Sequence, residues 1–187
     1  SDIDDPIKHS DVRNKSELLR NTFVRDFRAV EGMPDLYSSL FDAGVAFHYV
    51  SGSPWQLLGP IESFIDDAGF PKGTMHLKQF RLKDSSALEL LGSQVGTKLA
   101  SVEPLLMAFP DRTFILIGDT GEQDPEIYGK IARQYPDQVA AIYIRNATGE
   151  DRDDIRFVDA FREVADGKWI LFDEVSQIED HAKGLAN

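Results

Sequence analysis

The stretch TFILIGDTGEQDPEIY, residues 113–128, contains the features that decide the fold. It begins with a run of apolar and β-branched residues, which is typical of a buried strand, and near its end Pro125 favours the first turn of a helix. Between them, a glycine-containing turn carries Asp119, Glu122 and Asp124. Ligands of open α/β folds bind at the carboxyl ends of parallel strands, and carboxylates suit magnesium, so this turn is a candidate metal site. Acids at a helix start are also ordinary caps, which is the alternative for Asp124 and Glu126.

The same alternation of strand and helix extends along the chain in both directions. Strands are predicted at residues 45–50, 113–117, 139–144 and 169–172, a weaker one at 75–80, and the end of another at 1–3. Helices are predicted at residues 34–41, 54–67, 98–109, 125–135 and 152–165. This pattern predicts an α/β fold, a three-layer Rossmann-like parallel sheet with helices on both faces, in a single domain over residues 1–187. We expect the missing first part of the strand that ends at residue 3 to belong to a longer protein.

Composition narrows the possible chemistry. The chain has 187 residues, of which 42% are hydrophobic, so it can bury one substantial core. The absence of cysteine excludes disulfides, thiolate metal sites and cysteine nucleophiles. The formal net charge of −12 disfavours nucleic acid as a partner. The sequence shows neither a signal peptide's apolar segment nor a transmembrane segment, which would need about 20 apolar residues.

A second acidic cluster opens the chain with Asp2, Asp4 and Asp5. Strand alternation places Asp2 and Asp4 on the same side, at what the pattern predicts to be a strand exit. Two carboxylates on the same side can take different catalytic roles: one attacks a phosphorus atom as the nucleophile, and the other gives a proton to the leaving oxygen as the general acid. A divalent cation would neutralise the charge of a phosphate and the repulsion between the two carboxylates. The alternative is a solvated acidic end.

Two further positions fit a phosphate. The strand at 45–50 is followed by Ser51 and Gly52, whose hydroxyl and amide could hold an anion at the start of a helix beginning near Pro54. The alternative is that Ser51 or Ser53 caps that helix. Lys98 lies early in its predicted helix, where it opposes the helix dipole. If aspartates and a phosphate lie opposite this lysine, its positive charge would stabilise them. The alternative is an exposed lysine.

The order and chemistry of these four segments resemble the haloacid dehalogenase superfamily. Longer strings, DIDDPIKHSDV, HYVSGSPWQL, FPKGTMHLKQF and FPDRTFILIGDTGEQDPEIY, are similar to the catalytic domain of the actin-patch-associated phosphatidate phosphatases over residues 1 to about 175. The resemblance implies a magnesium-dependent phosphatase in which Asp2 is the nucleophile and Asp4 the general acid and base. It implies magnesium ligands from Asp2, the Asp4 carbonyl, Asp119 and Asp124, and phosphate held by Ser51 and Lys98.

One position departs from the superfamily pattern. Pro6 stands where threonine or valine is usual, and it removes an amide donor and fixes the backbone. Since Pro6 lies beyond the direct ligands, we expect weakened rather than abolished activity.

The spacing of Asp2, Ser51 and Lys98 leaves no room for a large cap domain, so we expect an open site. An open site admits a lipid head group presented by a membrane, and the resemblance implies phosphatidate or a related lipid phosphate as substrate. The expected location is cytoplasmic and peripheral to membranes. A basic stretch could touch the lipid surface or be a solvated loop edge; it comprises Lys72, Lys78, Arg81 and Lys83.

Three other interpretations remain open at this stage. One is a lipid sensor that binds phosphatidate without hydrolysing it, against which the retention of Asp2 and Asp4 argues. Another is a phosphatase for a soluble or protein phosphate. A response-regulator receiver also combines clustered acids with a lysine, but its second acidic loop would not follow the lysine as Asp119 does here.

Overall fold

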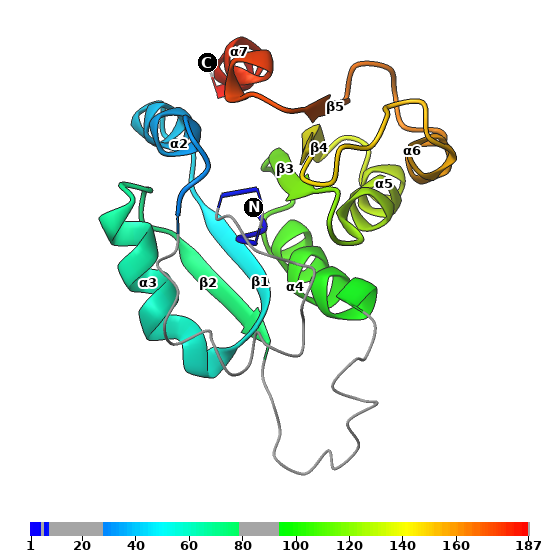
Figure 1. Ribbon diagram of the computed structural model, residues 1–187. Helices are drawn as coiled ribbons and strands as arrows, with labels where there is room; N and C mark the ends of the chain where they lie inside the picture. The colour runs from blue at the N-terminus through cyan, green and yellow to red at the C-terminus, as the bar shows by residue number, and fades with distance from the viewer. Residues whose placement is uncertain (5, 8–27, 79–93, 187) are drawn as a thin grey trace.

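The computed structural model describes residues 1–4, 6–7, 28–78 and 94–186 (Figure 1). Strand β1 (His48–Pro54) pairs in parallel with β2 (Thr74–Lys78), and β3 (Phe114–Asp119), β4 (Val139–Arg145) and β5 (Trp169–Phe172) form a second parallel set in that order. All described strand pairs are therefore parallel, as the sequence predicts, and their carboxyl ends point the same way.

The first three residues join these two sets of strands. The amide of Asp2 donates to the carbonyl of Ile117 at 2.8 Å, while the amide of Ile3 donates to the carbonyl of Val50 at 3.1 Å. On the β1 side, the amide of Val50 also donates to the Ser1 carbonyl at 2.8 Å. Residues 1–3 thus occupy a strand position between β1 and β3, and Figure 1 shows the N-terminus between them. The prediction of a strand end here is confirmed.

Helices cover both faces of the sheet. One face packs against α2 (Met33–Asp42), α3 (Leu58–Asp67) and α7 (Glu179–Ala186), and the other against α4 (Gln94–Ala108), α5 (Asp124–Gln134) and α6 (Ile155–Ala160) (Figure 1). Neighbouring residues of β3 show the division, since Ile117 belongs to the first apolar core and Leu116 to the second. Successive strand side chains alternate between faces, so both faces must be covered by helices.

Several element boundaries differ from the predicted ones. Strand β1 begins at His48, where its partner Thr74 becomes available, and continues through Ser51 to Pro54. A short 3-10 helix, η1 (Trp55–Leu57), then precedes α3, so the helical segment predicted over residues 54–67 begins as a 3-10 turn and becomes an α-helix at Leu58. Strand β3 likewise extends to Asp119, which is the last residue of the strand rather than part of the turn.

Helix α6 ends at Ala160, well before the predicted end at residue 165. The carbonyl of Ala160 accepts a hydrogen bond from Arg133 Nη1 of α5 at 2.6 Å, which takes it out of the helical pattern. Further along, Glu163 has a φ of 65°, a left-handed conformation that a helix cannot contain. A second 3-10 helix, η2 (Val175–Gln177), leads into α7.

Some predictions fall on residues outside the described ranges. Arg81 and Lys83 of the basic stretch and the last two residues of the predicted strand at 75–80 are among them. The expected absence of a large cap also falls partly on residues 8–27 and 79–93. Within residues 28–78, the chain between the first segment and β2 is taken up by α2, β1, η1 and α3. No helix of the described residues is both long enough and apolar enough to cross a bilayer.

Candidate active site

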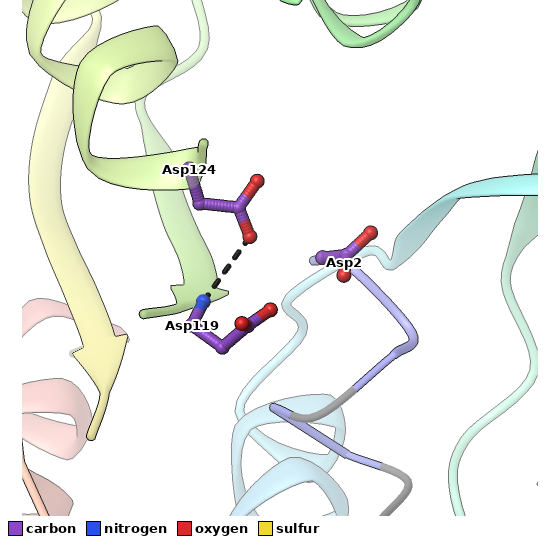
Figure 2. A group of neighbouring side chains, drawn as sticks. All are labelled: Asp2, Asp119 and Asp124. Atoms are coloured by element: carbon purple, nitrogen blue, oxygen red, sulfur yellow. Dashed lines mark hydrogen bonds between the residues drawn. The ribbon is translucent and has the colours of Figure 1, made fainter. Parts of the chain in front are cut away.

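Three aspartates from two distant parts of the chain converge at the carboxyl edge of the sheet. Asp2, Asp119 and Asp124 each offer a carboxylate oxygen, and these oxygens lie within 4.8 Å of one another. All three side chains are fully buried. Figure 2 shows Asp119 and Asp124 on one side and Asp2 facing them from the N-terminal segment. Three buried carboxylates repel one another unless cations lie among them, so the arrangement indicates a site for positive charge.

The end of β3 and the start of α5 fix two of these carboxylates. Asp119 Oδ1 accepts hydrogen bonds from the amides of Gly121 and Glu122 at 2.5 and 3.1 Å, which folds the turn around it. Asp124 Oδ2 accepts from the amide of Asp119 at 3.1 Å. Gly118 permits this contact, because a Cβ at that position would lie 2.7 Å from the Asp124 carboxyl carbon. The glycine before Asp119 is therefore part of the site's construction.

Lys98 supplies a cation from α4. Its ammonium is 3.2 Å from Asp2 Oδ1 and 3.0 Å from Glu122 Oε2, and it also forms an ion pair with Asp124 Oδ1. Its side chain is only 4% exposed, so the alternative of an exposed lysine is wrong. The structure thus places the ammonium of Lys98 beside the aspartates, where the sequence predicts a cation. Its proposed role toward a phosphate stays a prediction.

Asp4 and Ser51 lie next to the three aspartates. Ser51 Oγ donates to Asp4 Oδ2 at 3.1 Å and accepts from the amide of Ser53 at 3.0 Å. Ser51 is buried, Asp4 is half-buried and Gly52 is exposed. The η1 helix begins without a side-chain cap, so neither serine caps it. The structure places Ser51 beside Asp4, and the phosphate-binding roles of Ser51 and Gly52 stay predictions.

Burial and the neighbouring charges together set the protonation of Asp2, Asp124 and Lys98. Burial raises the pKa of Asp2 well above its ordinary value, against the opposing effect of the Lys98 cation, and the neighbouring charges of Asp124 and Asp4 raise it further. Burial likewise raises the pKa of Asp124. For Lys98, burial alone would lower the pKa, but Asp2 and Asp124 raise it well above its usual value. The ammonium therefore stays charged, while Asp2 and Asp124 hold protons more readily than exposed aspartates do.

The residues present fit a divalent cation. Both carboxylate oxygens of Asp2 are buried and accept no hydrogen bond from any of the described residues, and Oδ1 lies 3.2 Å from the ammonium of Lys98. A buried carboxylate oxygen without a donor is costly, and a metal ion would satisfy it. A donor set made only of carboxylate oxygens suits magnesium rather than softer metals.

We expect magnesium to raise the thermal unfolding midpoint more at about pH 7.5 than at about pH 5. The pKa values of Asp2 and Asp124 are raised in the folded protein. Their contribution to metal-free stability is therefore fully present below the ordinary pKa of 3.8 and is lost as pH rises through the raised values. Bound magnesium would compete with those protons and should restore stability where the carboxylates are charged. Differential scanning fluorimetry with magnesium or EDTA over a pH series measures the effect, and equal shifts at both pH values would contradict it.

The structure adds residues that the sequence pattern did not assign to the site. Glu122 was recognised in the acidic turn, but its ion pair with Lys98 was not. Arg156, near the start of helix α6, donates hydrogen bonds to two backbone carbonyls of the acidic turn, those of Thr120 and Glu122. The available signal was a basic residue early in a predicted helix, the same signal that pointed to Lys98.

Comparison with known proteins agrees with this geometry. Residues 1–146 match the family described as "Phosphatidate phosphatase APP1, catalytic domain". The fold and site thus belong to a class of phosphatase catalytic domains, and this chain is a member of the APP1 family within it. The resemblance stated from the sequence is confirmed at the level of this family.

Two relatives show the extent of the similarity. Phosphatidate phosphatase APP1 of Saccharomyces cerevisiae is 40% identical over 149 residues, which is 78% of this chain and 25% of the yeast protein. An uncharacterized protein of Schizosaccharomyces pombe is 28% identical over 154 residues, which is 80% of this chain and 25% of that relative. The chain therefore spans about a quarter of the length of these relatives.

Proposed function

We propose that this chain is a magnesium-dependent phosphatase of the haloacid dehalogenase type that hydrolyses phosphatidate or a related lipid phosphate. One observation carries the proposal: carboxylates from two separate segments and one ammonium from a third are buried together at the carboxyl edge of a parallel sheet. Burying so many charges is unfavourable for stability alone, so their convergence favours a functional explanation. Membership of the APP1 family supports the phosphatase chemistry.

Magnesium would be held by the carboxylates of Asp2, Asp119 and Asp124, together with the Asp4 carbonyl. The bound ion would neutralise the charge of the substrate phosphoryl group and orient its oxygens. The ammonium of Lys98, already 3.2 Å from Asp2 Oδ1, would hold both the nucleophile and a phosphoryl oxygen. Ser51 Oγ and the Gly52 amide would contact the remaining phosphoryl oxygens.

The reaction would proceed in two displacements on phosphorus. A carboxylate oxygen of Asp2 attacks the phosphorus atom, an aspartyl-phosphate forms, and the bond to the substrate alkoxide breaks. The Asp4 carboxyl group gives its proton to that alkoxide. Asp4 then accepts a proton from a water molecule, whose oxygen attacks the same phosphorus, releasing inorganic phosphate and restoring Asp2. The hydrogen bond from Ser51 Oγ supports this role by orienting the Asp4 carboxylate.

Two features support a substrate at a lipid surface. The family is named for phosphatidate phosphatase activity. Trp55 directly follows β1, four residues after Ser51, and its side chain is 50% exposed. Tryptophan suits the boundary between head groups and acyl chains, because its ring is apolar and its nitrogen can donate to polar groups.

A phosphate-release assay tests the proposal. Phosphatidate in vesicles, glycerol phosphate in solution and a phosphopeptide would each be offered with magnesium and with EDTA. Magnesium-dependent release from the vesicles at a much higher rate than from the soluble esters is expected. Preference for a soluble or protein phosphate would overturn the lipid assignment. Vesicle binding without release from any substrate would overturn the enzyme assignment in favour of a lipid sensor.

A further inference from the structure

Arg156 of α6 lies behind the acidic turn and contacts its backbone directly. Its Nη1 donates to the carbonyl of Thr120 at 2.7 Å, and its Nη2 donates to the carbonyl of Glu122. These two carbonyls flank Gly121, within the turn that connects Asp119 to Asp124. A single guanidinium thus holds the outer side of the turn whose inner side carries the candidate metal ligands.

The guanidinium is itself fixed by two carboxylates. Nε lies 2.7 Å from Glu126 Oε1, and Nη1 lies 2.9 Å from Glu150 Oε1. Next to it, Thr148 Oγ1 donates to the same Glu150 oxygen at 2.6 Å and is 2.7 Å from Thr120 Oγ1. The Arg156 side chain is 26% exposed. Each of its five N–H donors has a fixed direction, so only an arginine can reach all of these acceptors at once.

This network determines which way the turn amides point. The Thr120 carbonyl and the Gly121 amide belong to one planar peptide unit and point in opposite directions, so the contact of that carbonyl with Arg156 directs the Gly121 amide inward to Asp119 Oδ1. The contact of Arg156 with the Glu122 carbonyl holds the next residue of the turn, whose amide also donates to Asp119 Oδ1. Those amides set the orientation of the Asp119 carboxylate beside Asp2 and Asp124. Without the guanidinium, the two carbonyls would turn toward water and the turn could adopt other conformations.

We propose that Arg156 is a positioning residue that preorganises the acidic turn for magnesium. It acts through the backbone of residues 120–122 and touches neither the metal nor the substrate. It also lies beyond residue 146, where the match to the family ends, so the site depends on a part of the chain that the family match does not cover. This inference rests on the proposed function, because it assumes that the three aspartates bind a divalent cation.

Metal affinity is the decisive measurement, because it does not require turnover. Isothermal titration with manganese, as a probe for magnesium, would compare the parent with Arg156→Gln and Arg156→Lys. Arg162→Gln is the matched control, since it removes the same charge from an exposed residue whose guanidinium pairs with the exposed Asp159. Partners that orient metal ligands typically contribute about 10–100-fold to affinity, so a loss of at least about tenfold is expected in Arg156→Gln. Arg156→Lys should lose less, and Arg162→Gln should bind like the parent.

The possible outcomes separate the two proposals. If the parent binds no manganese, the proposed function fails. If the parent binds and both Arg156 variants bind equally well, only the positioning role fails. A lower unfolding midpoint in EDTA with unchanged affinity would show a purely structural arginine and would also overturn it. Should Arg156→Gln not fold, Arg156→Lys, which keeps the charge and most of the packing, decides the question by the same titration.

Discussion

Replacing Asp2 by asparagine is expected to reduce phosphate release by at least about 10³-fold. The amide has nearly the shape of the carboxylate but is a poor nucleophile and a weaker magnesium ligand. Folding should survive, because Asp2 is fully buried and its ionised form is costly there, as its raised pKa shows. Phosphate release from phosphatidate vesicles tests the expected loss of activity. The unfolding midpoint in EDTA, measured on the same preparation, tests whether the variant still folds.

Asp159→Asn is the matched control for that experiment. It makes the same chemical change on a side chain that is 57% exposed and pairs with Arg162, so activity should not change. If Asp2→Asn kept most of the parent's magnesium-dependent activity while remaining folded, Asp2 could not be the nucleophile.

Replacing Lys98 by methionine should cost about 3–5 kcal/mol of unfolding free energy in the absence of metal. Lys98 is the ammonium that faces Asp2, Asp124 and Glu122, and the first two of these carboxylates are fully buried. Methionine fills a similar volume but leaves the charges uncompensated. Asp2 and Asp124 already have raised pKa values, so they can take up protons, and the loss should be smaller at acidic pH than at neutral pH. Urea denaturation in EDTA at several pH values measures it.

Lys183→Met provides the comparison for the lysine substitution. The Lys183 side chain is 42% exposed and pairs with Glu179 one turn away, so its removal should cost less than about 1 kcal/mol. Equal stability of the two variants would show that the charge of Lys98 does not stabilise the buried carboxylates. Added magnesium should partly restore Lys98→Met, because it supplies positive charge to the same carboxylates.

The sequence predicted the parallel α/β architecture because its strongest strands are continuous apolar runs. The segments at 113–117, 139–144 and 169–172 match β3, β4 and β5 closely. The boundaries of β1 were harder, because the strand begins where Thr74 of β2 pairs with His48. The pattern of apolar residues within a strand does not show where a distant partner strand begins, so it cannot predict a boundary that depends on pairing. The same reason explains α6, whose end is fixed by Arg133 from another helix.

For the site, the sequence predicted which residue types would gather but not how they would contact one another. Asp2, Asp119, Asp124 and Lys98 were assigned from acidic clusters at strand exits and from a lysine that opposes its helix dipole. The hydrogen bond between Ser51 and Asp4 and the guanidinium of Arg156 behind the turn depend on tertiary geometry. A basic residue early in a predicted helix could draw attention to Arg156, but the sequence does not show which distant backbone carbonyls it contacts.

The strand position of residues 1–3 has a consequence for how the protein folds. Among the described residues, the two sets of strands are joined by hydrogen bonds through this short segment, which pairs with Val50 on one side and Ile117 on the other. Before it docks, two strand edges face each other across an open gap, each able to pair with another molecule. Self-association during refolding should therefore compete with insertion of the segment that carries Asp2. A misassembled chain would also lack the cluster of Asp2, Asp119 and Asp124.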